Sequence, residues 1–548
     1  MTDTAAIVEQ HARDTDRRLR WALALILMAQ MMVVLDTTIA NIALPYIGAD
    51  LEMSQANLTW IVTAYALAFG GLLLLGGRLG DLYGRRKMFI AGLTIFALAS
   101  LLGGVATSEA LLLTARGLQG FGAALAAPAA LALITTTFPA GPARSRAMAA
   151  YAGMSAAGAA IGLVLGGWLT GMDSAFGVDM EGWRLTFLIN VPIGLIAAAL
   201  APRLLLESES QTGKLDIPGA TTGTLGILGI VFGLGRASDV AYGWDHAQTI
   251  TSLLAGSAVL VVFVVIETRV HDPLLPMRVF ANRARATSFV AMLLAPAAMF
   301  AMFYFLSLFV QQIMGYSPLR AGIAFLPFAV GIVIGSGFAA TLANRLDPRI
   351  LAGTGSLLAA FALFMFSRLT ADDSPQAVLQ ALADQRPIGA GVNYWTDLLP
   401  WLLLMPFGMG LLFVPLTLTA VHRLRFEDAG IGSGVFNTVQ QVGGAIGLAA
   451  LSTVALHSTN ARATEVAGTL TQGLTSAGID ATSKVPGSDL TFLEAVTFQT
   501  TFIDGASDAF LAGTAMMLTA SAVIWLFLNV RHTEVADTEV PQNSAHRG

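Results

Sequence analysis

Fourteen runs of apolar residues, each about as long as a lipid bilayer is thick, decide what this chain can fold into. A helix needs about 20 apolar residues to cross a bilayer. Lipid offers backbone groups no partners, and the runs are too long and too continuously apolar for barrel strands, so each predicts a transmembrane helix. The chain is therefore expected to be an all-α, multi-pass membrane protein. The runs cover residues 21–48, 58–77, 88–107, 110–136, 147–171, 185–202, 217–235, 248–266, 286–312, 320–343, 349–368, 398–421, 430–456 and 508–530.

The composition excludes several other classes of protein. Only 12% of the 548 residues are charged, against about 25% in an ordinary soluble protein. The chain has no cysteine, which excludes disulfides and thiolate chemistry. It has no histidine cluster, basic tract, nucleophile–base constellation or Gly-rich nucleotide loop. The sequence therefore predicts no enzyme, no metal, no cofactor and no nucleic-acid partner.

The positions of Lys and Arg predict how the chain lies in the membrane. With the N-terminus in the cytoplasm, 22 of the 30 basic residues fall in cytoplasmic loops and 7 on the other side. Cytoplasmic loops normally carry this excess. Both termini are therefore predicted to be cytoplasmic. The first apolar run is also too long for a cleaved signal peptide.

A faint internal repeat predicts two related halves. Residues 77–87, GRLGDLYGRRK, and residues 340–350, ATLANRLDPRI, each follow the second helix of a six-helix block. Related halves are typical of transporters. The predicted organisation is a cytoplasmic tail 1–20, a six-helix bundle 21–203, two inserted helices 217–266, a second six-helix bundle 286–530 with extracytoplasmic loops 369–397 and 457–507, and a cytoplasmic tail 531–548.

The stretch GRLGDLYGRRK combines glycines, an acid and bases at a distinctive spacing. Its glycines allow close backbone approach, its aspartate can accept hydrogen bonds from helix amides, and its bases favour the cytoplasmic side. The spacing resembles the loop 2–3 signature of the major facilitator superfamily. That resemblance implies a conformational latch between the halves; the alternative is an ordinary basic loop. The latch residues would be Gly77, Asp81, Gly84, Arg85 and Arg86.

Four further stretches resemble motifs of the fourteen-helix drug:proton antiporters in that superfamily. These are LDTTIANIALP at 35–45, ARGLQGFGAA at 115–124, GAAIGLVLGG at 158–167 and WRLTFLINVPIG at 183–194. The chain is identified as a member of that group, with an actinobacterial source. The resemblance implies the major facilitator fold, with two six-helix bundles and two inserted central helices, in the cytoplasmic membrane of a bacterium.

The fifth-helix motif places small residues on one helix face. Glycines four residues apart lie on the same side of a helix and let neighbouring helices pack closely. The family's proline is Leu163 here, so any bend must come from the glycines. The motif glycines are Gly158, Gly162, Gly166 and Gly167.

Asp36 and Arg116 are charges inside apolar runs. Asp36 follows Trp21 by fifteen residues, which places it roughly 22 Å along its helix. A charge at that depth costs at least about 2.5–3.5 kcal/mol and must face protein or a wet cavity. A carboxyl group can take up and release a proton, whereas Arg116 is a fixed charge. We expect the two residues to couple transport to protons. The alternative is a structural role, with Asp36 bound to Thr37 or Thr38.

In the family the first and fourth helices of each half line the substrate cavity. Methionine and aromatic side chains on these helices suit varied apolar ligands. The alternative for each residue is that it faces lipid or core, or joins helices. The candidates are Asn41, Gln119, Phe300, Phe303, Tyr304, Gln311, Met405, Phe407 and Met409.

The sequence thus predicts a proton-coupled exporter that works by alternating access. Its substrates would be small amphipathic drugs or lipophilic compounds, and it would act as a monomer among membrane lipids. One alternative is a lipid or secreted-metabolite exporter. The other is a non-transporting receptor or scaffold that binds a partner through residues 457–507.

Overall fold

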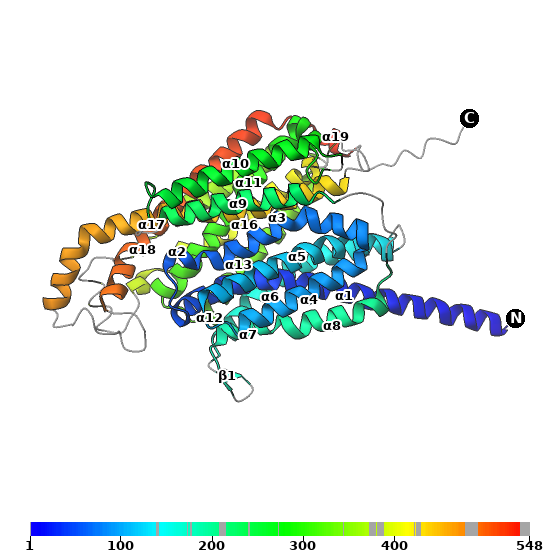
Figure 1. Ribbon diagram of the computed structural model, residues 1–548, viewed down its shortest axis with the longest axis horizontal. Helices are drawn as coiled ribbons and strands as arrows, with labels where there is room; N and C mark the ends of the chain where they lie inside the picture. Colours follow the sequence, from blue (N-terminus) through cyan, green and yellow to red (C-terminus); the bar gives the residue numbers. More distant parts are fainter. Residues whose placement is uncertain are drawn as a thin grey trace.

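The computed structural model is a bundle of long helices that run along one axis (Figure 1). The structure describes all residues except 1, 139–141, 173, 176–177, 208–214, 239–241, 272, 344, 372–376, 378–379, 381–387, 421, 423–428, 477–491 and 537–548. The first half contains α1 (Thr2–Asp50), α2 (Gln55–Leu58), α3 (Trp60–Tyr83), α4 (Arg85–Gly104), α5 (Glu109–Thr137), α6 (Pro142–Thr170), β1 (Ser174–Ala175), β2 (Val178–Asp179), α7 (Gly182–Leu188) and α8 (Asn190–Leu204).

The inserted pair is α9 (Ile217–Ser238) and α10 (Ala247–Arg269). The second half contains η1 (Met277–Ala281), α11 (Arg283–Leu308), η2 (Phe309–Ile313), α12 (Pro318–Ala324), α13 (Leu326–Leu342), α14 (Pro348–Phe366), η3 (Ile388–Gly391), η4 (Tyr394–Leu398), α16 (Leu399–Ala420), α17 (Ala429–Ser476), α18 (Phe492–Phe527) and α19 (His532–Ala536).

The predicted membrane-spanning helices are present. In the described part of the chain, thirteen helical segments are long and apolar enough to cross a membrane. The remaining predicted span, 147–171, lies in α6, a helix of 29 residues whose apolar stretch Ala157–Thr170 is shorter. At about 1.5 Å per residue, α6 is about 43 Å long and can cross a bilayer. The all-α membrane fold is confirmed, with one small addition: the two-residue strands β1 and β2 pair antiparallel.

Several helices extend beyond the predicted apolar runs. The predicted tail 1–20 is continuous with the first span, because α1 begins at Thr2. Much of the predicted loop 457–507 is helix, since α17 continues to Ser476 and α18 begins at Phe492 (Figure 1). Hydropathy marks the part of a helix that lipid covers, not where the helix ends. Most of loop 369–397 and the tail after residue 536 lie outside the described residues.

We call the end of the bundle that holds the start of α9 and all of α19 the terminal end, and the opposite end the distal end. The first half has its own core of buried side chains toward the terminal end, including Leu25, Phe89 and Phe96. At the distal end its buried residues, among them Ile42 and Trp183, join the core of the second half. The two halves therefore share their larger core near the distal end, and a smaller buried cluster joins Leu67 of α3 to Ala449 of α17.

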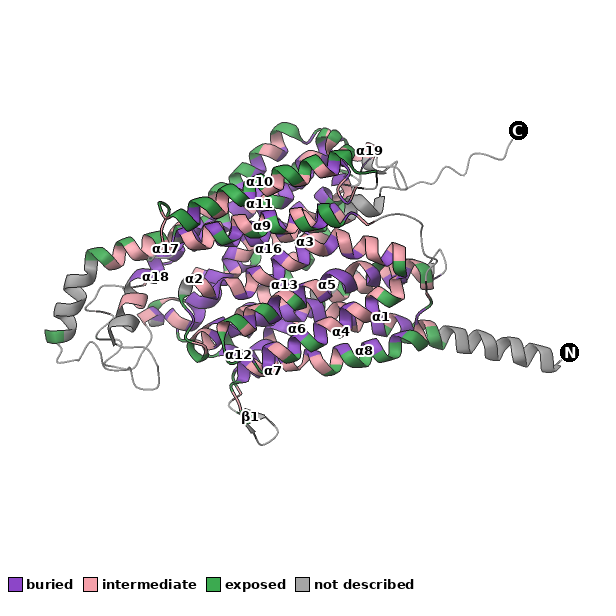
Figure 2. Cartoon of the chain, viewed as in Figure 1, coloured by how far each residue is buried: buried purple, intermediate pink, exposed green. Residues whose placement is uncertain are grey.

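The inserted helices form a hairpin on the outside of the two halves. α9 contacts α3 of the first half, where Thr224 donates a hydrogen bond to the Gly71 carbonyl (3.3 Å). It also contacts α17 of the second half, where Thr453 donates to the Leu234 carbonyl (2.9 Å). α10 packs on α9 and is mostly exposed (Figure 2). The hairpin thus covers the seam between α3 and α17.

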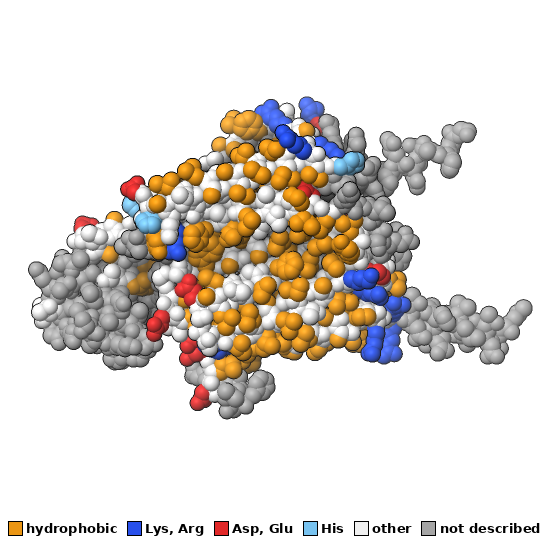
Figure 3. All heavy atoms as spheres, in the orientation of Figure 1, with side chains coloured by type: hydrophobic (Ala, Val, Ile, Leu, Met, Phe, Trp, Pro, Cys, Tyr) orange, Lys and Arg blue, Asp and Glu red, His pale blue; other side chains and the backbone are white. Residues whose placement is uncertain are grey.

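The surface has the pattern of a membrane protein. Hydrophobic side chains cover the middle of the face seen in Figure 3, and most of the visible Lys and Arg lie at the terminal end. A lipid-facing belt explains why large apolar side chains such as Leu254 and Val261 on α10 are exposed. The basic terminal end is what the predicted cytoplasmic placement of both termini requires.

Close packing of α5 on α3 gives a first prediction. A Cβ added at Gly120 would stand 2.5 Å from the Tyr65 carbonyl oxygen, whereas one added at Gly117 meets nothing within 4 Å. Overpacking typically costs about 1–3 kcal/mol. We expect Gly120→Ala to lower the melting temperature of the purified protein and Gly117→Ala, its matched control, to leave it unchanged or slightly raised. Equal melting temperatures for the two variants would contradict the packing described.

The carboxylate of Asp347 helps to hold the short helix α19 against the second half, in addition to the contact of Glu534 with His422 at 3.9 Å. Asp347 Oδ1 accepts hydrogen bonds from the backbone N–H of His532 (2.8 Å) and contacts its ring Nδ1 (2.9 Å). These hydrogen bonds, the side-chain one first, lower the pKa of Asp347 below its ordinary value. The ionised carboxylate therefore stabilises the docked helix at neutral pH, and this stabilisation is lost as the pH falls through the lowered pKa.

Removing that charge gives a second prediction. We expect Asp347→Asn to weaken the docking of α19 by less than about 1 kcal/mol, because the contact is exposed. Trypsin should then cleave after Arg531 faster at neutral pH than in the parent protein. Asp245→Asn, an exposed acid at the distal end of the inserted hairpin, is the control and should leave the cleavage rate unchanged. An unchanged rate in Asp347→Asn would show that other contacts hold α19.

Candidate functional site

A buried ion pair lies inside the first half. Arg116 on α5 donates from a guanidinium nitrogen to Asp36 Oδ2 on α1 at 2.5 Å. Asp36 is 3% exposed and Arg116 1% exposed. Charges so deeply buried need both pairing and further hydrogen bonds, since desolvation costs several kcal/mol per ion. The apolar sequence on both sides of Asp36 leaves these partners to other helices.

Three further side chains, those of Gln119, Ser100 and Asn190, extend the hydrogen-bond network around Asp36. Gln119 donates to Asp36 Oδ1 at 2.9 Å and Asn190, at the start of α8, donates to the same oxygen at 3.3 Å. Gln119 also donates to Ser100 Oγ on α4 at 2.9 Å. All three are fully buried. The carboxylate of Asp36 thus accepts hydrogen bonds from three side chains on two other helices.

Arg116 has partners besides Asp36. Its Nε donates to the Ile61 carbonyl oxygen at 2.7 Å, and its Nη1 donates to Gln119 Oε1 at 2.9 Å. Its guanidinium carbon lies 4.5 Å from the centre of the Tyr65 ring, a cation–π contact. Arg116 therefore has several partners besides Asp36.

Two polar atoms at this site have no hydrogen-bond partner among the described residues: Tyr65 Oη and Asn190 Oδ1. Buried polar atoms are rarely left unsatisfied, and such exceptions often occur at functional sites. Sequence reasoning missed Tyr65, Ser100 and Asn190. Only Asn190 lay in a quoted motif, and nothing in the sequence distinguished it from the polar residues that join helices.

Gln119, which was predicted to line a substrate cavity, is instead part of this network and is fully buried. Met405 and Met409 are also fully buried, in the core of the second half. Phe407 packs between helices, where its ring lies 6.1 Å from that of Phe338. Gln119, Met405 and Met409 are buried and half-buried Phe407 packs on a neighbouring ring, so in this conformation these four side chains contact protein.

Of the remaining predicted cavity residues, Asn41 and Gln311 lie where the two halves meet, and Phe300 and Phe303 pack within the second half. Ser307 on α11 donates to the Asn41 carbonyl oxygen on α1 at 2.8 Å, and the buried amide of Gln311 donates to Ser307 Oγ at 3.0 Å. The half-buried ring of Phe303 stacks on Phe325 with the ring centres 5.7 Å apart. Half-buried Phe300 packs against Gly444 of α17.

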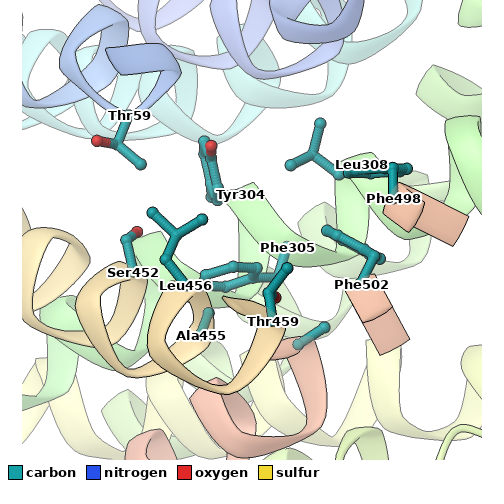
Figure 4. A pocket seen from close by; sticks show the side chains of 11 residues that line it. Thr59, Tyr304, Phe305, Leu308, Ser452, Ala455, Leu456, Thr459, Phe498 and Phe502 are labelled. Atoms are coloured by element: carbon teal, nitrogen blue, oxygen red, sulfur yellow. The ribbon is translucent and has the colours of Figure 1, made fainter. Parts of the chain in front are cut away.

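Tyr304 lines a small cavity at the distal end (Figure 4). Its walls come from α11, α17 and α18, together with Thr59 from the first half, and are mostly apolar. It encloses about 30 Å³, far below the roughly 300–1,000 Å³ of a drug-sized pocket. This cavity is therefore too small for a drug-sized substrate.

The predicted latch residues make their described contacts inside the first half. Arg85 donates to Asp81 Oδ1 at 3.0 Å. The backbone N–H of Arg86 donates to Glu207, just beyond α8, at 2.9 Å. Gly84, with φ +105°, lets the chain turn between α3 and α4 beside Glu207. A Cβ added at Gly77 would lie 3.8 Å from the Cβ of Pro128. None of these interactions reaches the second half. The role of these residues as a conformational latch between the halves therefore stays a prediction.

The glycine motif of α6 faces two different partners. Gly158, Gly162 and Gly166 lie against α1 of the same half. Gly167 instead contacts the backbone of Pro318 on α12, in the second half. Gly322 of α12 in turn contacts the carbonyl of Leu163, the residue that stands in place of the family's proline. The two halves therefore meet backbone to backbone near the distal end.

Two groups of six membrane-spanning helices, joined by an inserted pair and holding a buried charge pair, define a secondary transporter. The comparison with known families agrees: residues 26–448 match the Major Facilitator Superfamily, and the chain belongs to that family. The predicted family is confirmed, and the family and the relatives below are transporters rather than enzymes.

The relatives include several actinobacterial proteins. The puromycin resistance protein pur8 of Streptomyces alboniger is 42% identical over 81% of this chain and 84% of the relative. The cephamycin export protein CmcT of Amycolatopsis lactamdurans is 37% identical over 81% and 87%. The tetracenomycin C resistance and export protein of Streptomyces glaucescens is 29% identical over 94% of each chain.

Solved structures show the same fold. The crystal structure of a bacterial homologue of the human lysosomal transporter Spinster, in an inward-facing and unoccupied conformation, superposes with a TM-score of 0.64. It covers 96% of this chain and 99% of its own, at 16% identity. The crystal structure of tetrameric PepTSo2 gives a TM-score of 0.54 at 14% identity and covers 92% of this chain and 98% of its own.

The buried ion pair gives a third prediction, in the form of a double-mutant cycle. Breaking a buried pair from one side leaves an unpaired charge and costs about 3–5 kcal/mol. We expect Asp36→Asn and Arg116→Gln each to lower the melting temperature strongly. The double variant should lose much less than the sum of the two, because neither charge remains. Additive losses would show that the pair does not couple energetically.

Proposed function

We propose that the protein is a proton-coupled exporter of amphipathic or lipophilic compounds and that Asp36 is its proton-carrying group. The observation that carries this proposal is the Asp36–Arg116 pair, in which a titratable carboxyl group deep in an apolar helix faces a cation that cannot deprotonate. A purely structural helix contact would not require so expensive a charge.

The cycle we propose uses the two six-helix bundles, 21–203 and 286–530, as the moving parts. In the conformation described, the halves meet at the distal end and Asp36 is sealed from water. When the halves separate at the distal end, Asp36 would gain access to water there and take up a proton as substrate leaves. Closing the distal end and opening the terminal end would release that proton while Arg116 stays bound to Ile61 and Gln119.

Other predicted parts have supporting roles in this cycle. The latch residues around Asp81 would hold the halves at the terminal end during distal opening. The glycine contact of Gly167 with Pro318 would be the surface that separates. We propose that half-buried Phe300 and Phe303, together with Asn41, face substrate once the halves move apart, and that one protein molecule in its lipid surroundings suffices for transport.

The substrate class rests on the relatives. Their names state resistance to or export of puromycin, cephamycin and tetracenomycin C. These names support drug export by this chain. The same names support a second candidate, the export of a metabolite that the source organism secretes, because two of them state export of an antibiotic. Efflux assays with antibiotics, dyes and lipids in one expressing strain distinguish the candidates.

A receptor or scaffold that transports nothing is the remaining alternative. Substrate-driven proton flux in proteoliposomes discards it, because a scaffold moves neither substrate nor protons. Efflux of a fluorescent dye from an expressing strain, with and without a protonophore, gives the same answer in cells.

The fourth prediction tests the proton site. We expect Asp36→Asn to abolish substrate transport driven by a pH gradient in proteoliposomes, because the amide cannot carry a proton. Exchange of labelled for unlabelled substrate without a gradient should continue, because it requires substrate movement alone. Both transport modes should be unchanged in Asp245→Asn, the exposed control.

Full gradient-driven transport by Asp36→Asn would refute the assignment. Asp36→Glu is the companion variant: it restores a carboxyl group at the same site, and we expect it to regain part of the gradient-driven rate with a changed pH profile. Loss of both transport modes in Asp36→Asn, with restoration of neither in Asp36→Glu, would assign Asp36 a structural role instead.

A further inference from the structure

A pair of buried acids lies at the terminal end of the inserted hairpin. Asp216 immediately precedes α9 and Glu267 lies in the last turn of α10. Asp216 is 4% exposed and Glu267 3% exposed. The two carboxyl groups approach the same point beside the backbone of Gly219. Neither residue takes part in the site around Asp36.

Each carboxyl group has one oxygen occupied and one oxygen without a donor. Asp216 Oδ1 accepts from the backbone N–H of Gly219 at 2.8 Å, and Glu267 Oε2 accepts from that of Leu275 at 2.9 Å. Asp216 Oδ2 and Glu267 Oε1 have no hydrogen-bond partner in the part of the chain that the structure describes. Both of these oxygens lie over Gly219, at the point where its Cβ would stand, and Glu267 Oε1 is 2.6 Å from that point. The two free oxygens therefore lie near the same point, beside Gly219.

No cation neutralises this pair among the described residues. The charged side chains on the surrounding elements are Arg269 on α10, His271 after it, Arg278 on η1, and Arg78 and Asp81 on α3. None of the ion pairs formed by the described residues includes Asp216 or Glu267. The described part of α17 carries no charged side chain at this end. Lys214 and Asp272 lie outside the described residues.

Two ionised carboxylates cannot share a buried site without strong repulsion, so such pairs hold a proton. The helix dipoles indicate which group carries it. Asp216 caps the N-terminus of α9, where a negative charge is stabilised, whereas Glu267 lies near the C-terminus of α10, where it is not. A proton on Glu267 Oε1 would donate to Asp216 Oδ2 and satisfy both free oxygens at once.

We propose that Asp216 and Glu267 form a proton-binding site at the terminal end of the inserted hairpin, with one shared proton bound at neutral pH. This site goes beyond the proposed role of Asp36. It ties the segment that enters α9 to the segment that leaves α10, because Glu267 also holds the backbone of Leu275 on the way to α11. Loss of the proton sets two negative charges against each other and loosens this connection beside the seam that α9 covers.

The fifth prediction measures the melting temperature of the purified full chain against pH, from about pH 5 to about pH 9. The folded protein holds a proton that two unfolded carboxyl groups do not hold at neutral pH, so its stability falls as the pH rises and the pair ionises. Glu267→Gln supplies a permanent N–H donor to Asp216. We expect this variant to show a flatter profile between about pH 5 and about pH 9, because it lacks the proton whose retention causes the decline.

Asp245→Asn, on the same hairpin but exposed at the distal end, should follow the parent profile and serves as the matched control. Parallel profiles of the parent protein and Glu267→Gln would overturn the proposal. Should Glu267→Gln fail to fold, Asp216→Asn provides the reciprocal donor and is expected to show the same flattened profile; an unflattened profile would overturn the proposal.

Infrared spectroscopy provides a readout that a structural contact alone would not change. At neutral pH the parent protein and Asp245→Asn should show the carbonyl stretch of a protonated carboxylic acid, and Glu267→Gln should lack it. Absence of that band from the parent protein would refute a bound proton. A saturable rise in melting temperature with sodium or calcium, lost in Glu267→Gln, would assign the site to a metal cation and also refute the proposal. None of these measurements depends on transport, so they do not depend on the role of Asp36.

Discussion

The ion pair between Asp36 and Arg116 is the interaction on which the first half of the protein depends. In lipid-covered helices a single charge is costly, and two charges are tolerated only when several helices supply hydrogen bonds at the same depth. Here α1, α3, α5 and α8 supply groups that bind Asp36 or Arg116, and α4 supplies Ser100, which binds Gln119 of the same network. The need to satisfy these charges therefore fixes how five helices are placed, and apolar packing fills the space around them.

Close backbone contact is the second constraint, and it acts mainly where the halves meet. Gly167 and Gly322 bring α6 and α12 together without side chains between them. A contact made of backbone and small residues has few interlocking side chains, so it can part and re-form as a unit. The bundle thus combines a rigid interior, held by polar bonds, with an interface whose strength depends on fit alone.

The sequence predicted the fold well, because apolar runs of bilayer length leave few alternatives. It also predicted that Asp36 is buried, since its position within one such run sets its depth. The partners of Asp36 were harder to find: Ser100 and Asn190 are single polar residues in apolar helices, and only the packing shows that they face the ion pair rather than each other. Gln119 was assigned to a cavity for the same reason.

Interactions that depend on segments far apart in the sequence were also missed. Glu207 binds Arg86 across more than a hundred residues, and no spacing rule connects them. Asp216 and Glu267 lie at the very ends of two apolar runs, where acids normally face water and attract no attention. The helical continuation of α17 was missed because hydropathy reports contact with lipid, whereas a helix continues wherever its backbone bonds are satisfied.

That continuation has a mechanical consequence. α17 contains 48 residues and is therefore about 72 Å long, more than twice the thickness of the hydrocarbon core. Its distal part projects beyond the bundle as a curved helix that is continuous with the membrane-embedded part (Figure 1). A tilt of about 10° would move the tip of a 30 Å rod by about 5 Å. Small rearrangements at the centre of the protein are thereby amplified at its surface, where a partner, a label or a neighbouring molecule can detect them.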